Sequence, residues 1–201
     1  MSDAIDFWFS FGSLYSYLSI MRIGDVARQT GVTIRWRPFS VRTIMVEMDN
    51  IPAKKPIKLA YSWRDVERRA VMYGIGFTAR PPYPLKNSDL GNRIATLAAG
   101  EGWCAEFTRA AYWRWFQDGQ EAGSEPNNSA ALRDIGQEPE RVLAQAEAPE
   151  IVRAYQAATD EARALGIFGS PTFVARGELF WGDDRLADAI AWNRSGTLAA
   201  R

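Results

Sequence analysis

The hydrophobic pattern at the start of the chain predicts a strand, a helix and a second strand. Residues 5–9 form a short, mostly apolar and aromatic run, as expected of a strand buried on both faces of a sheet. From about Ser13, apolar residues recur at helical spacing as far as Gly31, which is placed to end a helix. Residues 32–37 then alternate between apolar and polar before Pro38, which indicates a half-buried strand. This order describes a βαβ unit with a right-handed crossover.

The middle of the chain shows no strand pattern. Residues 50–58 are rich in Pro and Lys and predict a loop, whereas residues 61–72 are charged and helix-prone. Residues 79–86 predict a second loop, because Pro lacks an N–H group and restricts the residue before it. Residues 123–129, rich in Gly, Ser and Asn, predict a third. Regularly spaced apolar residues indicate two one-sided helices, the first with Trp103, Phe107, Ala111 and Trp115, and the second with Ile151, Tyr155, Ala158, Ala162 and Leu165.

The last part of the chain returns to strands. Residues 172–175 and 178–181 are separated by two residues that include a Gly, which predicts a hairpin with a tight turn. A final helix follows, with Leu186 and Ile190 facing the core. The strands predicted near the two ends of the chain can therefore form one sheet, with the neighbouring helices packed on it.

The order of these elements matches a thioredoxin fold interrupted by a helical block. Without residues 42–148, the order is β-α-β-α-β-β-α, which is the thioredoxin order. We therefore predict an α/β protein in which residues 1–41 and 149–201 form a thioredoxin-like domain. Residues 42–148 are predicted to form an all-helical insertion domain.

Composition and charge narrow the classes of partner. Hydrophobic residues make up 47% of the 201 residues and aromatic residues 12%, which indicates a globular protein with a large core. Lys plus Arg equals Asp plus Glu at 24 each, so no net charge attracts nucleic acid or anionic lipid. The first residues lack the basic segment of a secretory signal, and no apolar run approaches the ~20 residues of a membrane span. We therefore expect a cytoplasmic protein without a nucleic-acid or membrane partner.

The residue types that are absent exclude most catalytic devices. The chain contains no His and a single cysteine, Cys104. A Ser-His-Asp triad, a Cys-His pair, an HExxH zinc site, a CxxC redox pair and an internal disulfide are therefore excluded. Cys104 lies between Trp103 and Phe107 on a predicted helix, so we expect a buried small hydrophobe. Any chemistry must use hydroxyls, carboxylates, Lys, Arg, backbone dipoles or a borrowed cofactor.

Two serines occupy positions at which they could take part in binding or catalysis. Ser13 stands where the first strand gives way to the first helix, where its ordinary role is an N-cap. A thiolate placed beside its hydroxyl would also be stabilised by the amides and the positive end of the helix. Ser170 precedes Pro171 just before the hairpin. In the thioredoxin arrangement this proline is cis, and the backbone of the preceding residue pairs with a peptide ligand, so we expect a cis bond here.

Polar residues elsewhere offer two further candidate binding groups. Asp183 and Asp184 precede the last helix, where they serve as helix caps or, alternatively, receive the α-ammonium of a γ-glutamyl group. Lys58 and Asn50 lie in a polar loop and form either a solvated surface pair or, if the loop folds over the cleft, a site for a glycyl carboxylate and a peptide backbone.

These motifs together resemble a known family. Ser13-Leu-Tyr-Ser-Tyr-Leu18 resembles the Ser-Pro-Tyr-Ser-Trp/Tyr-Leu start of the 2-hydroxychromene-2-carboxylate isomerases and kappa-class glutathione transferases. Further motifs match in the same order along nearly the whole chain: Trp36-Arg-Pro-Phe39, Asn50, Pro56-x-Lys58-x-x-Tyr61-x-x-x-Asp65, Phe168-Gly-Ser-Pro171 and Phe180-Trp-Gly-Asp-Asp-Arg185. The Trp-Gly-x-Asp-Arg end is similar to the isomerase branch.

The resemblance implies a DsbA-like thioredoxin fold, glutathione as cofactor and a homodimer. It implies that Ser13 activates the glutathione thiol, and that the tripeptide is held by Asn50, Lys58, Ser170, Asp183 and Asp184. The thiolate of that family is thought to add to a conjugated carbon of the substrate, permit rotation and leave again. Two positions depart from the pattern: Leu14 replaces Pro, and Val46 replaces a Lys, with Arg42 as the nearby cation.

Three functions remain open from the sequence. The first is an isomerase of 2-hydroxychromene-2-carboxylate or a related unsaturated aromatic carboxylate, with Arg42, Tyr83 or Asn87 helping to hold the organic anion. The second is a kappa-class-like transferase or peroxidase that acts on small electrophiles and consumes the thiol. The third is a non-catalytic binding protein of the thioredoxin fold, which the lack of a CxxC pair permits.

Overall fold

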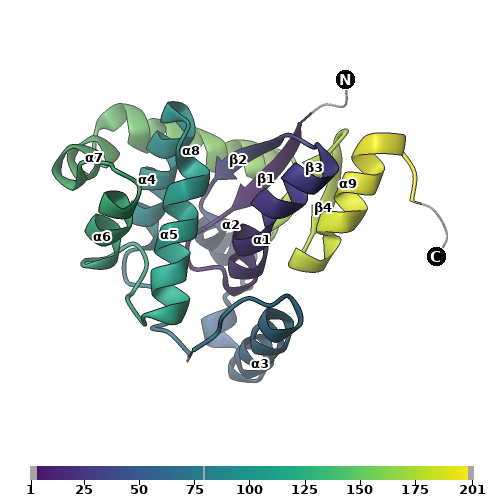
Figure 1. Ribbon diagram of the computed structural model, residues 1–201, viewed down its shortest axis with the longest axis horizontal. Helices are drawn as coiled ribbons and strands as arrows, with labels where there is room; N and C mark the ends of the chain where they lie inside the picture. Colours follow the sequence, from purple (N-terminus) through teal and green to yellow (C-terminus); the bar gives the residue numbers. More distant parts are fainter. Residues whose placement is uncertain (1–3, 79, 199–201) are drawn as a thin grey trace.

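Four short strands form one mixed sheet in the computed structural model, which describes residues 4–78 and 80–198 (Figure 1). The strands lie in the order β2-β1-β3-β4. Their bounds are Ile5–Phe9 for β1, Ile34–Pro38 for β2, Thr172–Ala175 for β3 and Glu178–Trp181 for β4. β1 runs parallel to β2 and antiparallel to β3, which pairs antiparallel with β4. This is the predicted thioredoxin-like sheet.

Helices and the loops between them form the rest of the described chain. Their bounds are Leu14–Thr30 for α1, Val41–Glu47 for α2, Pro56–Met72 for α3, Ser88–Glu101 for α4, Cys104–Gln117 for α5, Asn127–Asp134 for α6, Pro139–Ala146 for α7, Pro149–Ala164 for α8 and Leu186–Ser195 for α9. Short 3₁₀ turns, η1 at Pro52–Lys54 and η2 at Asp183–Arg185, precede α3 and α9. In Figure 1, α4 to α7 gather at one side of the sheet and α9 at the other, while α3 lies apart and packs on α1.

β1 is buried on both faces, as the run at residues 5–9 predicts. On one face Phe7 stacks between Phe9 and Phe173, with ring centroids 5.4 and 5.3 Å away. This face belongs to the large core shared with α1, α9 and the helices of the middle block. On the other face Trp8 packs with Phe39 in a smaller core that α2 and α8 complete. Both cores meet at β1, so β1 is the central element of the fold.

The first helix has the predicted boundaries. The side chain of Ser13 accepts a hydrogen bond from the N–H of Ser16 and caps the helix. Gly31 ends it with φ of 69°, and its N–H donates to the carbonyl of Ala27. Both signals are local, and both predictions are confirmed.

Several predicted boundaries in the middle of the chain are wrong. Lys58 lies in helix α3 and not in a loop, because Pro56 occupies the first helical turn, where its missing N–H costs nothing. Residues 123–129 include the start of α6, which begins at Asn127. Leu165 is 41% exposed, because α8 ends one residue before it. The second strand begins at Ile34 and includes Pro38.

Side chains of the middle block satisfy the backbone at the end of β1. Asn92 of α4 accepts a hydrogen bond from the N–H of Phe11 at 2.8 Å, and its amide nitrogen donates to the hydroxyl of Ser10 at 3.3 Å. Tyr112 of α5 donates to the carbonyl of Ser10 at 2.9 Å. Asn92 and Tyr112 are both buried. The helical block therefore fixes the turn that leads to Ser13.

The division into domains at residues 42 and 148 stays a prediction.

None of the helices in the part of the chain that the structure describes combines the length and apolar character that a membrane span needs.

We predict that Asn92→Leu lowers the free energy of unfolding by about 1–3 kcal/mol, because it leaves the buried N–H of Phe11 without an acceptor. Thr96→Ala is the matched control on the same helix, since the Thr96 hydroxyl donates to a backbone carbonyl of that helix. We expect the control to change stability by about 0.5 kcal/mol or less. Urea unfolding measures both, and equal losses in the two variants would contradict the proposed tie between α4 and β1.

Candidate functional site

The turn between β1 and α1 brings Ser13 next to Ser170. The Ser13 hydroxyl donates a hydrogen bond to the backbone carbonyl of Ser170 at 2.6 Å. The same oxygen accepts from the N–H of Ser16 at 3.3 Å. Ser13 is therefore a helix cap and at the same time faces the segment before the hairpin, 157 residues away.

Ser170 uses its side chain inside the protein. Its hydroxyl oxygen accepts from the N–H of Ser10 at 3.0 Å and lies 2.8 Å from the hydroxyl of Ser16. The residue is 8% exposed. The predicted cis bond between Ser170 and Pro171 is confirmed. The backbone of Ser170, and not its hydroxyl, is thus the part that faces Ser13.

A cavity of about 440 Å³ opens beside these two serines. Such a volume falls in the range of about 300–1,000 Å³ that is typical of small-ligand sites. Eight of the nine predicted site residues line it: Ser13, Arg42, Asn50, Lys58, Tyr83, Ser170, Asp183 and Asp184. Asn87 does not line it, because its side chain caps α4 by accepting from the N–H of Leu90. The neighbouring Ser88 lines the cavity in its place.

Apolar side chains and a cation also line the cavity. Val41, Arg42 and Met45 of α2 and Tyr83 and Leu85 of the loop before α4 are among them. The ring of Tyr83 stands edge-on to Trp63 at 5.7 Å. Burial raises the pKa of the Tyr83 phenol, and nearby Arg42 opposes the rise. The phenol therefore stays protonated at neutral pH and can donate a hydrogen bond.

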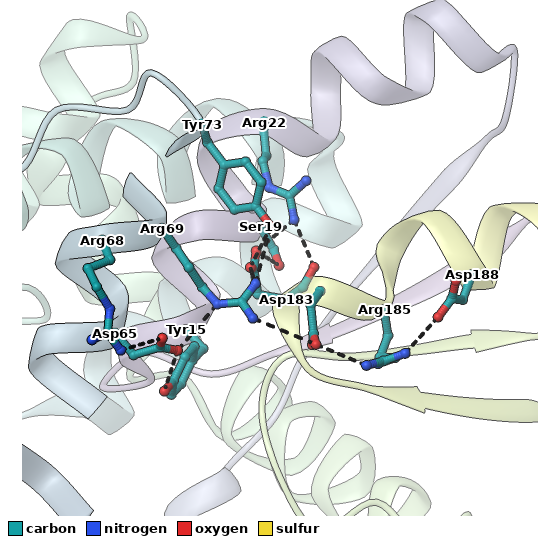
Figure 2. Close-up of polar contacts among 11 residues, drawn as sticks. Tyr15, Ser19, Arg22, Asp65, Arg68, Arg69, Tyr73, Asp183, Arg185 and Asp188 are labelled. Atoms are coloured by element: carbon teal, nitrogen blue, oxygen red, sulfur yellow. Dashed lines mark hydrogen bonds and ion pairs between the residues drawn. The ribbon is translucent and has the colours of Figure 1, made fainter. Parts of the chain in front are cut away.

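Asp183 is held by arginines from two helices (Figure 2). It is 1% exposed, and its carboxylate lies 2.7 Å from a guanidinium nitrogen of Arg22 and 3.4 Å from one of Arg69. Tyr73 donates to it at 3.2 Å. Arg22 also donates to the Asp183 carbonyl at 2.7 Å and stacks on the ring of Tyr73. The carboxylate of Asp183 is thus engaged in contacts within the protein.

Asp184 has the more available carboxylate. Its side chain is 40% exposed, with Arg69 at 3.7 Å and Arg185 at 3.0 Å. Gly182 before the pair has φ of 115°, and a Cβ there would lie 2.7 Å from the Asp184 carboxylate, so glycine is needed. Neither aspartate caps a helix with its side chain, so the capping role considered from the sequence is wrong.

Sequence reasoning missed the residues that hold this corner of the cavity. Tyr15 donates to Asp65 at 3.1 Å, and Asp65 also contacts Arg69 at 3.2 Å. Burial, followed by the charge of Asp65, raises the pKa of Tyr15 to about 12, so Tyr15 stays a hydrogen-bond donor. Asp65 stands within a motif quoted above, but Arg22 and Arg69 show no local signal.

At another side of the cavity, Asn50 lies among lysines. Its side-chain oxygen is 3.5 Å from the ammonium of Lys58 and 3.2 Å from that of Lys55. The pairing of Asn50 with Lys58 was predicted, although Lys58 comes from a helix. A cationic corner and an acidic corner therefore belong to the same cavity as Ser13.

The DsbA-like thioredoxin domain model matches residues 4–190. The chain belongs to the DsbA-like thioredoxin family. A 2-hydroxychromene-2-carboxylate isomerase from Sphingobium xenophagum is 30% identical over 189 residues, which cover 92% of this chain and 95% of that protein. This identity assigns the chain to the isomerase branch and confirms the resemblance found in the motifs.

A further relative agrees with this assignment, and a solved structure agrees with the fold. The 2-hydroxychromene-2-carboxylate isomerase from Pseudomonas putida is 26% identical over 188 residues, which cover 90% of each chain. A solved structure of a 2-hydroxychromene-2-carboxylate isomerase has the same fold, with a TM-score of 0.84 at 24% identity, covering 94% of this chain and 93% of that chain.

This member of the DsbA-like family carries no reactive thiol of its own at the site. Ser13 and Ser16 stand at the start of α1, and each lies against Ser170. Cys104 is buried, and burial raises the pKa of its thiol to about 12. The expectation that Cys104 is a small buried hydrophobe is confirmed, so a thiol at this site would have to come from a ligand.

We predict that Arg22→Met lowers the free energy of unfolding by about 2–4 kcal/mol, because the buried carboxylate of Asp183 loses its nearest cation. Adding Asp183→Asn to this variant should recover part of the loss, since the uncompensated charge is then gone. Arg28→Met on the same helix is the control, because its ion pair with Asp25 is exposed. The account of this corner fails if thermal unfolding shows the same loss for Arg22→Met and Arg28→Met.

Proposed function

We propose that this protein is a glutathione-dependent isomerase of 2-hydroxychromene-2-carboxylate or a related unsaturated aromatic carboxylate. The names of its relatives support an isomerase of this kind. One observation carries the proposal: the Ser13 hydroxyl and the Ser170 backbone lie together in a cavity that also has a carboxylate corner and a lysine corner.

The residues of the cavity fit a zwitterionic tripeptide thiol. Asp184 offers a half-exposed carboxylate for an α-ammonium group. Lys58 offers a cation for the glycyl carboxylate at another side, and the amide of Asn50 lies beside it. Asp183 acts indirectly, because its carboxylate holds Arg22 and Arg69 in place. The Ser170 backbone lies next to Ser13, where a cysteinyl residue would have to place its sulfur.

Bound glutathione would supply the thiol nucleophile that adds to a conjugated carbon and leaves after rotation. Ser13 would stabilise the negative charge on sulfur by donating a hydrogen bond. The N-terminus of α1, a helix of 17 residues, adds a positive dipole end at the same place. Both effects lower the pKa of a thiol from its free value of about 8.5.

Arg42 and Tyr83 are proposed to hold the carboxylate of the aromatic substrate. They line the cavity together with Val41, Met45 and Leu85, which can cover a planar ring. The phenol of Tyr83 remains protonated and the guanidinium of Arg42 is exposed, so both can donate to an organic anion.

Mass balance separates this function from the transferase alternative, because a transferase or peroxidase consumes glutathione. Incubation with a chromene carboxylate should give an isomer of unchanged mass and leave the glutathione concentration constant, as followed by mass spectrometry. Loss of glutathione would favour a transferase or peroxidase. Glutathione binding without turnover of either a chromene carboxylate or a generic electrophile would favour a binding protein.

We predict that Ser13→Ala raises the pKa of the thiol of bound glutathione by about one to two units, because one charge-assisted hydrogen bond to sulfur is lost while the helix amides remain. Turnover at neutral pH should fall accordingly. Thiolate absorbance near 240 nm against pH measures the shift. Ser62→Ala is the control, because Ser62 also lines the cavity but donates to the carbonyl of Lys58. An identical titration in wild type and Ser13→Ala would reduce Ser13 to a helix cap.

Asp184→Ala should weaken glutathione binding about 10- to 100-fold, through loss of a charge-assisted partner for the α-ammonium group. The exposed Glu178 of β4 provides the control variant Glu178→Ala, for which we expect unchanged affinity. Titration calorimetry measures both. Unchanged affinity in Asp184→Ala, with the fold intact by circular dichroism, would remove Asp184 from the binding site.

A further inference from the structure

We propose that Ser13 exchanges its hydrogen-bond acceptor when the cofactor binds, and that this exchange selects thiols that carry an amide N–H beside the thiol-bearing side chain. The proposal rests on glutathione being the cofactor. It concerns the single proton of the Ser13 hydroxyl and the carbonyl of Ser170 that holds it.

The Ser13 hydroxyl has one proton to donate, and in the structure that proton goes to the Ser170 carbonyl at 2.6 Å. The lone pairs of the same oxygen serve the N–H of Ser16, which keeps the residue at the helix start. Ser13 therefore cannot donate to a sulfur atom and keep its present bond. Donation to a thiolate requires the hydroxyl to leave the Ser170 carbonyl.

The Ser170 carbonyl cannot simply turn away once it loses this donor. The Ser170 side chain is held by the N–H of Ser10 and the hydroxyl of Ser16. On the other side, the Pro171 carbonyl accepts from the N–H of Gly182 at 3.0 Å, and Thr172 begins β3. The segment is thus fixed at both ends. A carbonyl left there without a donor would be destabilising, so a ligand that supplies a replacement N–H is favoured.

A cysteinyl residue within a peptide supplies such a replacement. Its amide N–H is attached to the Cα that carries the CH₂–SH group, so the N–H and the sulfur can reach neighbouring partners together. The N–H would take the Ser170 carbonyl, and the Ser13 proton would then turn to the sulfur. The thiol proton leaves to bulk water, as in any thiol titration. A simple thiol such as 2-mercaptoethanol lacks the N–H and would leave Ser13 on the carbonyl.

The decisive test compares glutathione with an analogue that is methylated on the cysteinyl nitrogen. In the wild-type complex, we expect the thiol pKa of the analogue to lie about one to two units above that of glutathione. It should equal the value that Ser13→Ala gives with either ligand, because both changes remove the same hydrogen bond to sulfur. An analogue methylated on the glycyl nitrogen is the matched control, and it should titrate like glutathione. Thiolate absorbance near 240 nm against pH is the readout.

A second measurement applies if the analogue methylated on the cysteinyl nitrogen binds too weakly for its thiol to be titrated in the complex. S-Methylglutathione keeps the cysteinyl N–H but has no thiolate to receive the Ser13 proton. By removing the competitor for the Ser170 carbonyl, Ser13→Ala should tighten binding of S-methylglutathione about 2- to 10-fold. The same variant should weaken binding of glutathione above its bound thiol pKa. Calorimetry should therefore show changes of opposite sign, which a purely structural role of Ser13 would not produce.

The outcomes separate this proposal from the proposed function. An equally low thiol pKa for glutathione and the N-methylcysteinyl analogue would overturn the exchange and leave glutathione as the cofactor. Changes of the same sign for both calorimetric ligands would also overturn it. Failure of glutathione itself to bind the wild-type protein would overturn the proposed function together with the exchange.

Discussion

The backbone that leaves β1 turns inside the protein, and its polar groups must be satisfied there without water. Partners from three distant elements meet this requirement: Asn92 of α4, Tyr112 of α5, and Ser170 of the segment before the hairpin. An unpaired buried amide or carbonyl is costly, so the turn forms only when all three parts are in place. The position of Ser13 is therefore a property of the whole fold and not of its local sequence.

The same constraint explains why the cavity contains polar groups with defined directions. α1 and α3 supply the arginines that hold Asp183, and this pairing fixes the turn that carries Asp184. α3 also supplies Lys58, which lies about three turns before Arg69 on the same helix. One helix therefore contributes to both the acidic and the cationic corners. Its packing on α1 sets the distance between the two groups that we propose bind the ends of a tripeptide.

The sequence predicted the parts of the fold that depend on local signals. The aromatic run of β1, the cap at Ser13, the stop at Gly31 and the hairpin after Pro171 each follow from a few neighbouring residues. The boundaries in the middle block were less accurate, because proline at Pro56 and Pro126 marks the start of a helix as well as a loop. Pattern alone does not distinguish the two.

The sequence predicted residues that gather at one cavity, but not how those residues are connected. Eight of nine residues line one cavity, and the ninth, Asn87, is one residue away from Ser88, which does. The partners of Asp183 could not be predicted, because Arg22 and Arg69 lie 161 and 114 residues away in the chain. Nor could any pattern show that the Ser13 proton is already given to the Ser170 carbonyl, since that contact exists only after both segments have packed.

A crystal structure of the complex with glutathione would test the proposed role of Ser13 most directly. We predict that the sulfur lies within hydrogen-bond distance of the Ser13 hydroxyl, that the cysteinyl N–H faces the Ser170 carbonyl, and that the two ends of the tripeptide lie at Asp184 and Lys58. A sulfur atom placed away from Ser13, with the Ser13 hydroxyl still on the Ser170 carbonyl, would contradict the central claim that Ser13 activates a borrowed thiol.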